Sequence, residues 1–162
     1  MNAKRIYLDS SVIVKRYLKE VASEVVDVAF DNAEVGKVKL YFSVWNIGET
    51  IGVFDKYGKK GFLSEDELKR VLGDFLSETI KLSKLGGLYV MPITHAHLTT
   101  SWLMVLKHHI YVSDALQIAS SKNNCDVLLS GDERLVRIAH LEGLDAVNVE
   151  KSPEEALKLM PE

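Results

Sequence analysis

The sequence contains little cysteine and proline, and both shortages narrow the possible classes of protein. The only cysteine, Cys125, cannot form an internal disulfide and fits a reducing compartment. It precedes an apolar run, so we interpret it as a packing residue, with a catalytic thiol as the alternative. With only three prolines, the chain shows no low-complexity segment and no internal repeat.

Long apolar runs and an excess of positive charge are also absent. No apolar run approaches the roughly 20 residues that span a bilayer. The first residues lead into a strand too short, and too soon interrupted by Asp9, to be the apolar part of a signal peptide. We therefore expect a cytoplasmic protein with no membrane association. The net charge of -3 does not attract a polyanion, so a nucleic-acid substrate would need local basic patches or metal ions.

The apolar content is sufficient for one core, because 47% of the 162 residues are hydrophobic. We predict a single domain, residues 1–162. Short apolar segments alternate with helical patterns, which predicts a three-layer α/β/α sandwich with a mostly parallel central sheet. Right-handed crossovers then place the carboxyl ends of the strands along one edge. The predicted strands are 6–8, 38–42, 88–91, 126–129 and 146–149, and the later predicted helices include 64–85, 95–107, 114–121 and 133–141.

Four isolated acids are associated with that edge. Asp9 and Asp132 each follow a predicted strand directly, and Glu49 lies about two turns into the helix after the second strand. Asp114 begins a helix that is apolar on almost every side. Each has a purely structural explanation, since the three aspartates are good helix N-caps and Glu49 can face solvent or a partner. Capping alone, however, does not predict that all four share one edge.

Carboxylates that meet within a few ångströms cannot all stay ionised unless cations join them. Oxygen ligands without His or Cys select Mg²⁺ or Mn²⁺. One or two such ions, about 4 Å apart when paired, generate hydroxide and stabilise the leaving oxygen of a phosphodiester. Asp126 begins its predicted strand and is excluded, because it would lie at the opposite edge of the sheet.

The motifs YLDSSVIVKRYL, WNIGE, VSDALQIASS and CDVLLSGDERL, in this order, resemble the PIN-domain family, especially its VapC-type toxin ribonucleases. The resemblance covers essentially the whole chain. It implies an Mg²⁺- or Mn²⁺-dependent endoribonuclease in which Asp9, Glu49, Asp114 and Asp132 bind metal and are catalytic. Ser10 and Ser130 match supporting hydroxyl positions. The resemblance also implies homodimerisation, an RNA substrate and a cognate antitoxin protein.

Two other functions remain open at this point. A phosphomonoesterase or phosphotransferase of another α/β fold also places an aspartate at a strand end, but its usual second acid is here Ser11. A non-catalytic module that binds RNA or protein is the other alternative, and the presence of all four acids argues against it.

The remaining features allow two interpretations each. The pair Lys15 and Arg16 either lines an RNA path or belongs to a solvated helix face. Trp45 and Trp102 either stack on bases or belong to the core. We expect neighbouring histidines to point apart and to have solvent or packing roles. The apolar side of the segment 64–85 predicts a homodimer, and it comprises Leu68, Val71, Leu72, Phe75, Leu76, Ile80 and Leu82.

Overall fold

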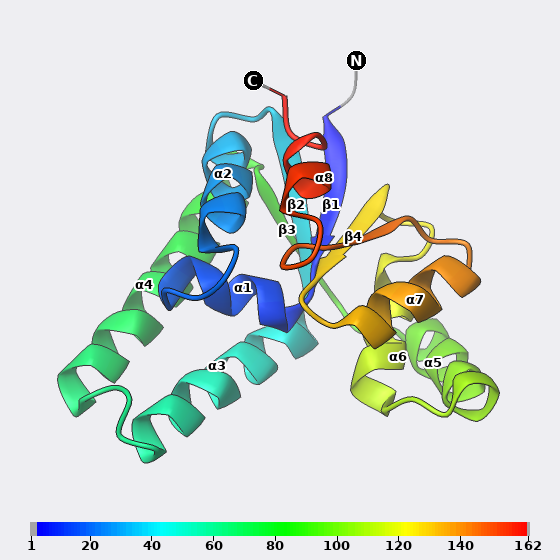
Figure 1. The fold of residues 1–162 in the computed structure, drawn as a ribbon, viewed down its shortest axis with the longest axis horizontal. Helices are drawn as coiled ribbons and strands as arrows, with labels where there is room; N and C mark the ends of the chain where they lie inside the picture. Colours follow the sequence, from blue (N-terminus) through cyan, green and yellow to red (C-terminus); the bar gives the residue numbers. More distant parts are fainter. Residues whose placement is uncertain (1–2, 162) are drawn as a thin grey trace.

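The computed structural model describes residues 3–161 and contains one five-stranded sheet in the order β3-β2-β1-β4-β5 (Figure 1). Every neighbouring pair of strands is parallel. The predicted α/β/α sandwich is therefore confirmed. The strands are β1 Lys4–Leu8, β2 Val38–Ser43, β3 Leu88–Met91, β4 Val127–Ser130 and β5 Ala146–Asn148.

The helices agree closely with the predicted ones, with one difference that concerns the site. Helix α6 begins at Val112, so Asp114 is its third residue and not its N-cap. Tyr111 takes the N-cap position, and its carbonyl accepts the first helical hydrogen bond, from the Ala115 N–H. The helices are α1 Ser10–Tyr17, α2 Ser23–Glu34, α3 Val44–Lys59, α4 Glu65–Leu85, α5 His95–His108, α6 Val112–Ser121, α7 Glu133–Leu141 and α8 Pro153–Leu157.

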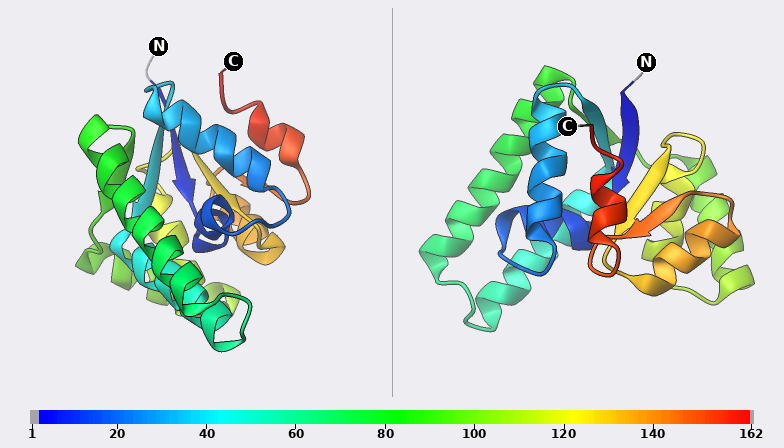
Figure 2. Two further views of the ribbon diagram at one scale, coloured as in Figure 1. Left: turned by 90° about the vertical axis from the view of Figure 1, so that its left-hand side faces the viewer. Right: turned by 45° about the horizontal axis from the view of Figure 1, so that its top comes forward.

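The sheet is covered on both faces because its strands alternate between two cores. Ile6 and Leu8 belong to a core shared with α1, α2, α3, α4 and α8, whereas Tyr7 belongs to a second core shared with α5, α6 and α7. Figure 2 shows these two groups of helices on opposite sides of the sheet. A sheet buried on both faces explains why its strands are nearly continuous apolar runs.

The strand order reverses next to β1. The chain first builds outward through β2 and β3, then returns to the other side of β1 to form β4 and β5. Ligands of open α/β sheets bind outside the carboxyl ends of the strands at such a switch point. Asp9 and Asp132, which follow β1 and β4, are therefore at the position where this topology favours a site.

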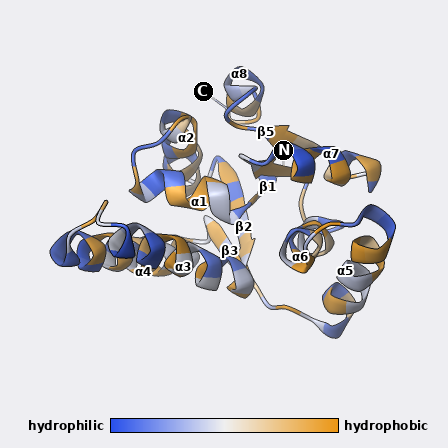
Figure 3. Cartoon of the chain, turned by 60° about the horizontal axis from the view of Figure 1, so that its bottom comes forward, coloured by the Kyte–Doolittle hydropathy of each residue, from blue (hydrophilic) through white to orange (hydrophobic). Residues whose placement is uncertain are grey.

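Helix α4 uses most of its apolar side within the chain. Val71, Phe75 and Leu82 are buried in the core, whereas Leu76 and Ile80 remain 43% and 55% exposed. Figure 3 shows hydrophobic and hydrophilic residues interspersed along this helix. The apolar stripe of 64–85 was the basis of the dimer prediction, and most of it is explained by packing on the protein's own core.

The connection from α4 to β3 needs two glycines for different reasons. Gly86 ends the helix with φ 78°, a left-handed conformation that favours glycine. Gly87 is buried, and a Cβ atom there would lie 2.2 Å from the carbonyl oxygen of Ala33 at the end of α2. The close approach of two backbones thus fixes where β3 enters the sheet.

Candidate active site

Asp9 continues the backbone pairing of β1 for one residue beyond the strand, because its N–H donates to the carbonyl of Leu129 at 3.0 Å. Its side chain is buried, and Oδ2 accepts hydrogen bonds from the hydroxyls of Ser11 at 2.6 Å and Ser130 at 2.7 Å. Asp9 occupies the N-cap position of α1, but its side chain makes no capping hydrogen bond. The carboxylate is therefore held by hydroxyls from two segments, which capping does not require.

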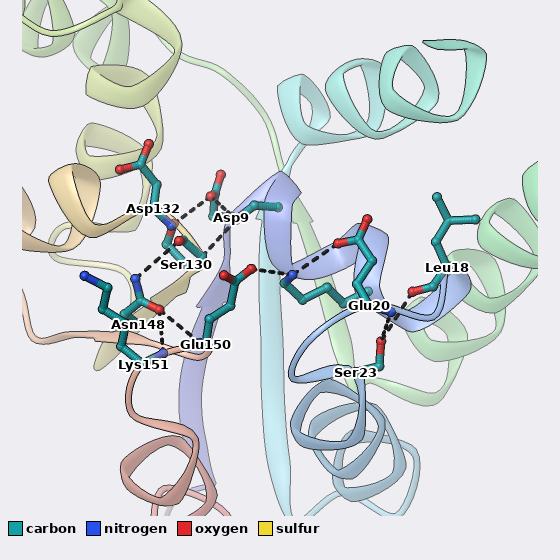
Figure 4. A network of polar contacts seen from close by, with 12 residues as sticks. Asp9, Leu18, Glu20, Ser23, Ser130, Asp132, Asn148, Glu150 and Lys151 are labelled. Carbon is teal, nitrogen blue, oxygen red and sulfur yellow. Dashed lines mark hydrogen bonds and ion pairs between the residues drawn. The ribbon is translucent and has the colours of Figure 1, made fainter. Parts of the chain in front are cut away.

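Asp132 is joined to Asp9 through Ser130. The Ser130 hydroxyl that donates to Asp9 also accepts from the Asp132 N–H at 2.9 Å (Figure 4). Oδ1 of Asp132 accepts the N–H groups of Arg134 at 2.7 Å and Leu135 at 3.1 Å, so the capping explanation is correct for this aspartate. Capping and site membership coexist, since only one oxygen is used for the cap.

Glu49 is held by a buried polar network beneath it. The Ser10 hydroxyl donates to Glu49 Oε2 at 2.6 Å and accepts from the Asn46 amide at 2.9 Å. The same amide nitrogen donates to Gln117 Oε1 at 2.7 Å, and Asn46 Oδ1 accepts from the Tyr7 hydroxyl at 2.7 Å. Strand β1 and helices α1, α3 and α6 therefore converge on the glutamate.

The pKa of Asp114 reflects the charges of the other three acids. This pKa is raised to about 6, first by burial and then by the negative charges of Asp9, Asp132 and Glu49, against a lowering by Arg134. The pKa of Glu49 is also raised, by burial and by the charge of Asp9, despite hydrogen bonds from Ser10 and Trp45. The structure thus brings all four predicted acids into one electrostatic environment.

The donor set suits a hard divalent cation. The hydrogen bonds within residues 3–161 reach Oδ2 of Asp9 and Oδ1 of Asp132, which leaves the second oxygen of each available. Burial and mutual repulsion at Asp114 are a cost that a bound cation removes. Among these same residues, no three Asp, Glu, His or Cys side chains form a preassembled metal cage. The acids are neighbours here without being a coordination sphere.

A hollow of about 540 Å³ adjoins Asp132, and a buried ion-pair cluster forms part of its wall. The Lys15 side chain is only 4% exposed, and its ammonium donates to Glu20 at 3.1 Å and to Glu150 at 2.6 Å. Arg16 is similarly engaged by Glu78 at 2.8 Å. The solvated-face interpretation is wrong for Lys15, which is buried, and both cations are engaged in ion pairs.

Sequence reasoning missed the residues that support the Ser130–Asp132 turn. The Gly131 N–H donates to the Ser11 hydroxyl at 3.0 Å, and its carbonyl accepts from the Asn148 amide at 3.2 Å. Asn46 and Gln117 were missed as well. Their only sequence signal is an uncharged amide within a mostly apolar helix, which is too common to single out a residue.

Several secondary predictions can be compared directly with the structure. Asp126 lies at the opposite edge of the sheet, as predicted, and pairs with Arg5 at 2.6 Å. Cys125 is buried, consistent with packing, and burial raises the pKa of its thiol to about 12. Trp45 and Trp102 are 44% and 55% exposed, so the core interpretation is wrong for both.

The structure defines an α/β protein with acids near the switch point of a parallel sheet. The chain belongs to the PIN-domain family, because the PIN domain model matches residues 6–141 and all four acids lie inside the match. PIN domains are generally metal-dependent nucleases. A comparison with curated proteins finds no match. Among residues 3–161, no helix has the length and apolarity needed to cross a bilayer.

Proposed function

We propose that this protein is a single-domain, metal-dependent endoribonuclease that hydrolyses RNA phosphodiester bonds. The observation that supports this most directly is the set of contacts at the carboxyl ends of β1 and β4, where the Ser130 hydroxyl joins Asp9 to Asp132 and Ser10 holds Glu49. The raised pKa of Asp114, caused by burial and by the charges of the other three acids, agrees with it. Four segments distant in sequence contribute these acids to one sheet edge. A cluster of this kind destabilises the folded chain, so a bound cation offers the simplest reason for its presence.

In this proposal the acids bind the metal ion and the serines orient the acids. Asp9, Glu49, Asp114 and Asp132 would hold Mg²⁺ or Mn²⁺. When bound, such a cation supplies a Lewis acid that lowers the pKa of water and stabilises a leaving oxygen. The Ser130 hydroxyl donates to the Asp9 carboxylate and accepts from the Asp132 N–H, so it fixes these two residues relative to each other. The Ser10 hydroxyl orients Glu49.

The phosphomonoesterase alternative loses support at Ser11, where that chemistry needs a second acid. The Ser11 hydroxyl donates to Asp9 and accepts from the Gly131 N–H, so it orients the aspartate. The non-catalytic alternative has no specific observation in its favour.

The test is cleavage of an internally labelled, single-stranded RNA. We expect internal cleavage with Mg²⁺ or Mn²⁺, none with EDTA, and at least a hundredfold loss in Asp9→Asn. Asp126→Asn is the matched control, because Asp126 lies at the opposite edge of the sheet, and it should cleave normally. Wild-type activity in Asp9→Asn would refute the proposed site.

We also propose that the protein is the toxin of a type II toxin-antitoxin pair in the cytoplasm, as the VapC-like motifs imply. Expression in a bacterial host should stop growth for the wild type and not for Asp9→Asn. Co-expression of a cognate antitoxin should restore growth. Equal growth of both strains at matched protein levels would contradict the toxin assignment.

We also propose that the protein forms a homodimer. The support for this is the apolar side chains that remain exposed on the folded chain. On α5, Trp102, Leu103 and Leu106 are 55%, 68% and 73% exposed. Leu76 and Ile80 of α4 are exposed as well. Exposed apolar groups of this size often mark a protein interface. Light scattering at micromolar concentration should give about twice the chain mass, and a monomer mass would reject the dimer.

A further inference from the structure

Two lysines near the acidic edge are already engaged in ion pairs. Lys15 is shared by two glutamates, and Lys151 pairs with Glu133. These two lysines therefore offer little free positive charge to a polyanionic chain that approaches the carboxylates. Two cations without such a partner in the described part of the chain lie on α7, the helix that begins directly after Asp132.

Arg134 and Arg137 are both exposed, and neither has a carboxylate partner within residues 3–161. Residues three apart lie on the same side of a helix. Together with Glu133 they line an open surface hollow of about 330 Å³. Because the Glu133 charge is offset by Lys151, the hollow carries the net charge of two guanidinium groups.

Arg134 is also fixed in direction and close to the acids. Its Nη2 donates to the carbonyl oxygen of His109 at 2.6 Å, which anchors one end of the guanidinium. Its positive charge acts on Asp114, whereas Arg137 lies about one helical turn further from Asp132. Arg134 and Arg137 therefore lie at increasing distance from Asp132 along α7.

We propose that Arg134 and Arg137 form a phosphate subsite that holds the backbone of single-stranded RNA beside the bond to be cleaved. Guanidinium groups match phosphate oxygens in charge and geometry, and they supply affinity independent of base sequence. The identity of the ligand as RNA rests on the proposed function. The subsite assigns the direction in which the strand leaves the acidic cluster, along the exposed side of α7.

The experiment measures RNA binding and its salt dependence by fluorescence anisotropy, with Ca²⁺ in place of Mg²⁺ and RNA integrity checked on a gel. Removing two phosphate contacts should lower the slope of log affinity against log salt by about 1.4. We expect Arg134→Gln/Arg137→Gln to bind about tenfold more weakly near 0.1 M salt. Arg70→Gln/Lys84→Gln removes the same charge from exposed positions on α4 and should change neither value much.

A melting curve of each variant separates a binding defect from a folding defect. Arg137→Gln alone should show about half the slope change, which preserves the test if loss of the His109 contact unfolds the double variant. An unchanged slope in a folded arginine variant would overturn the subsite. If that variant binds like the wild type while metal-dependent cleavage persists, the subsite fails and the nuclease proposal stands. If the slope falls as expected but the wild type cleaves no RNA, the nuclease proposal fails and the subsite stands.

Discussion

Replacing Asp114 with asparagine should stabilise the metal-free protein at neutral pH. Burial and three neighbouring carboxylates make the ionised form of Asp114 unfavourable in the folded state. Asparagine has nearly the same shape and carries no charge. The substitution therefore removes a repulsion that the wild-type chain relieves only by binding a cation or a proton.

The magnitude follows from the pKa of Asp114, which rises from 3.8 to about 6. At about 1.4 kcal/mol per unit, the ceiling is about 3 kcal/mol. Solvent screening of this partly exposed side chain reduces it to about 2 kcal/mol. Loss of a negative charge in the first turn of α6 costs about 0.5 kcal/mol or somewhat more. A net gain of about 1 kcal/mol remains, equivalent to a rise in Tm of about 2 to 4 °C.

The effect has a definite pH window. The folded-state pKa of Asp114 lies above its unfolded value, so the wild type keeps this contribution to stability below pH of about 4. It loses the contribution as the pH rises from about 4 through about 6. The Asp114→Asn variant should therefore differ little in stability from the wild type at pH 4 and exceed it increasingly up to about pH 7.

Thermal melts in EDTA at pH 4 and pH 7.5 test this expectation. Asp126→Asn is a control of opposite sign, because a hydrogen bond from Arg5 lowers the pKa of Asp126 and the substitution should destabilise the protein at pH 7.5. Mg²⁺ at ten times its Kd should stabilise the wild type by about 1.4 kcal/mol and Asp114→Asn much less. If Asp114→Asn melts at or below the wild-type Tm at pH 7.5 in EDTA, the electrostatic reasoning is wrong.

Three other substitutions test the scaffold by chemical denaturation. Gly87→Ala should cost about 2 kcal/mol or more, because its Cβ would lie 2.2 Å from the Ala33 carbonyl oxygen, and an unchanged midpoint would contradict this close approach. Glu142→Gln should lower stability at pH 7, since hydrogen bonds from His108 and then two lysines lower the pKa of Glu142 to about 2. That contribution should fade as the pH falls from about 4.5 toward 2, so a difference that persists at pH 2 would contradict its electrostatic origin. Tyr7→Phe should cost about 1 kcal/mol by removing a buried hydrogen bond to the asparagine of α3, and a neutral result would show that this bond contributes little.

The regular part of the fold was predictable because local chemistry and long-range packing agree there. The Ser64 hydroxyl and the Glu67 carboxylate form the reciprocal capping bonds that their spacing indicates, at 3.2 and 2.8 Å. Strand β3, Leu88–Met91, has its predicted bounds because two glycines precede it and a proline follows it. The start of α6 was misplaced because Tyr111 holds the N-cap position through its backbone, without a side-chain signal.

The candidate site was predictable only where charge stands out against an apolar background. Asp9, Glu49, Asp114 and Asp132 were proposed because each is an isolated acid near one sheet edge. The burial of Lys15 could not be predicted, because its partner Glu150 lies 135 positions away in sequence. Local pattern does not reveal a contact that the sheet topology creates.

The hydroxyl groups around the acids explain how a chain with this much local negative charge still folds. Each hydroxyl that donates to a carboxylate stabilises its ionised form, and Ser10 opposes the rise in the pKa of Glu49 in this way. Asp9 receives two such bonds, whereas no hydrogen bond to Asp114 is present among residues 3–161. Within these residues, Asp114 therefore lacks the hydroxyl donors that stabilise the Asp9 carboxylate. Because burial and the charges of Asp9, Asp132 and Glu49 raise the pKa of Asp114, a cation bound among these acids would restore stability that the metal-free chain lacks.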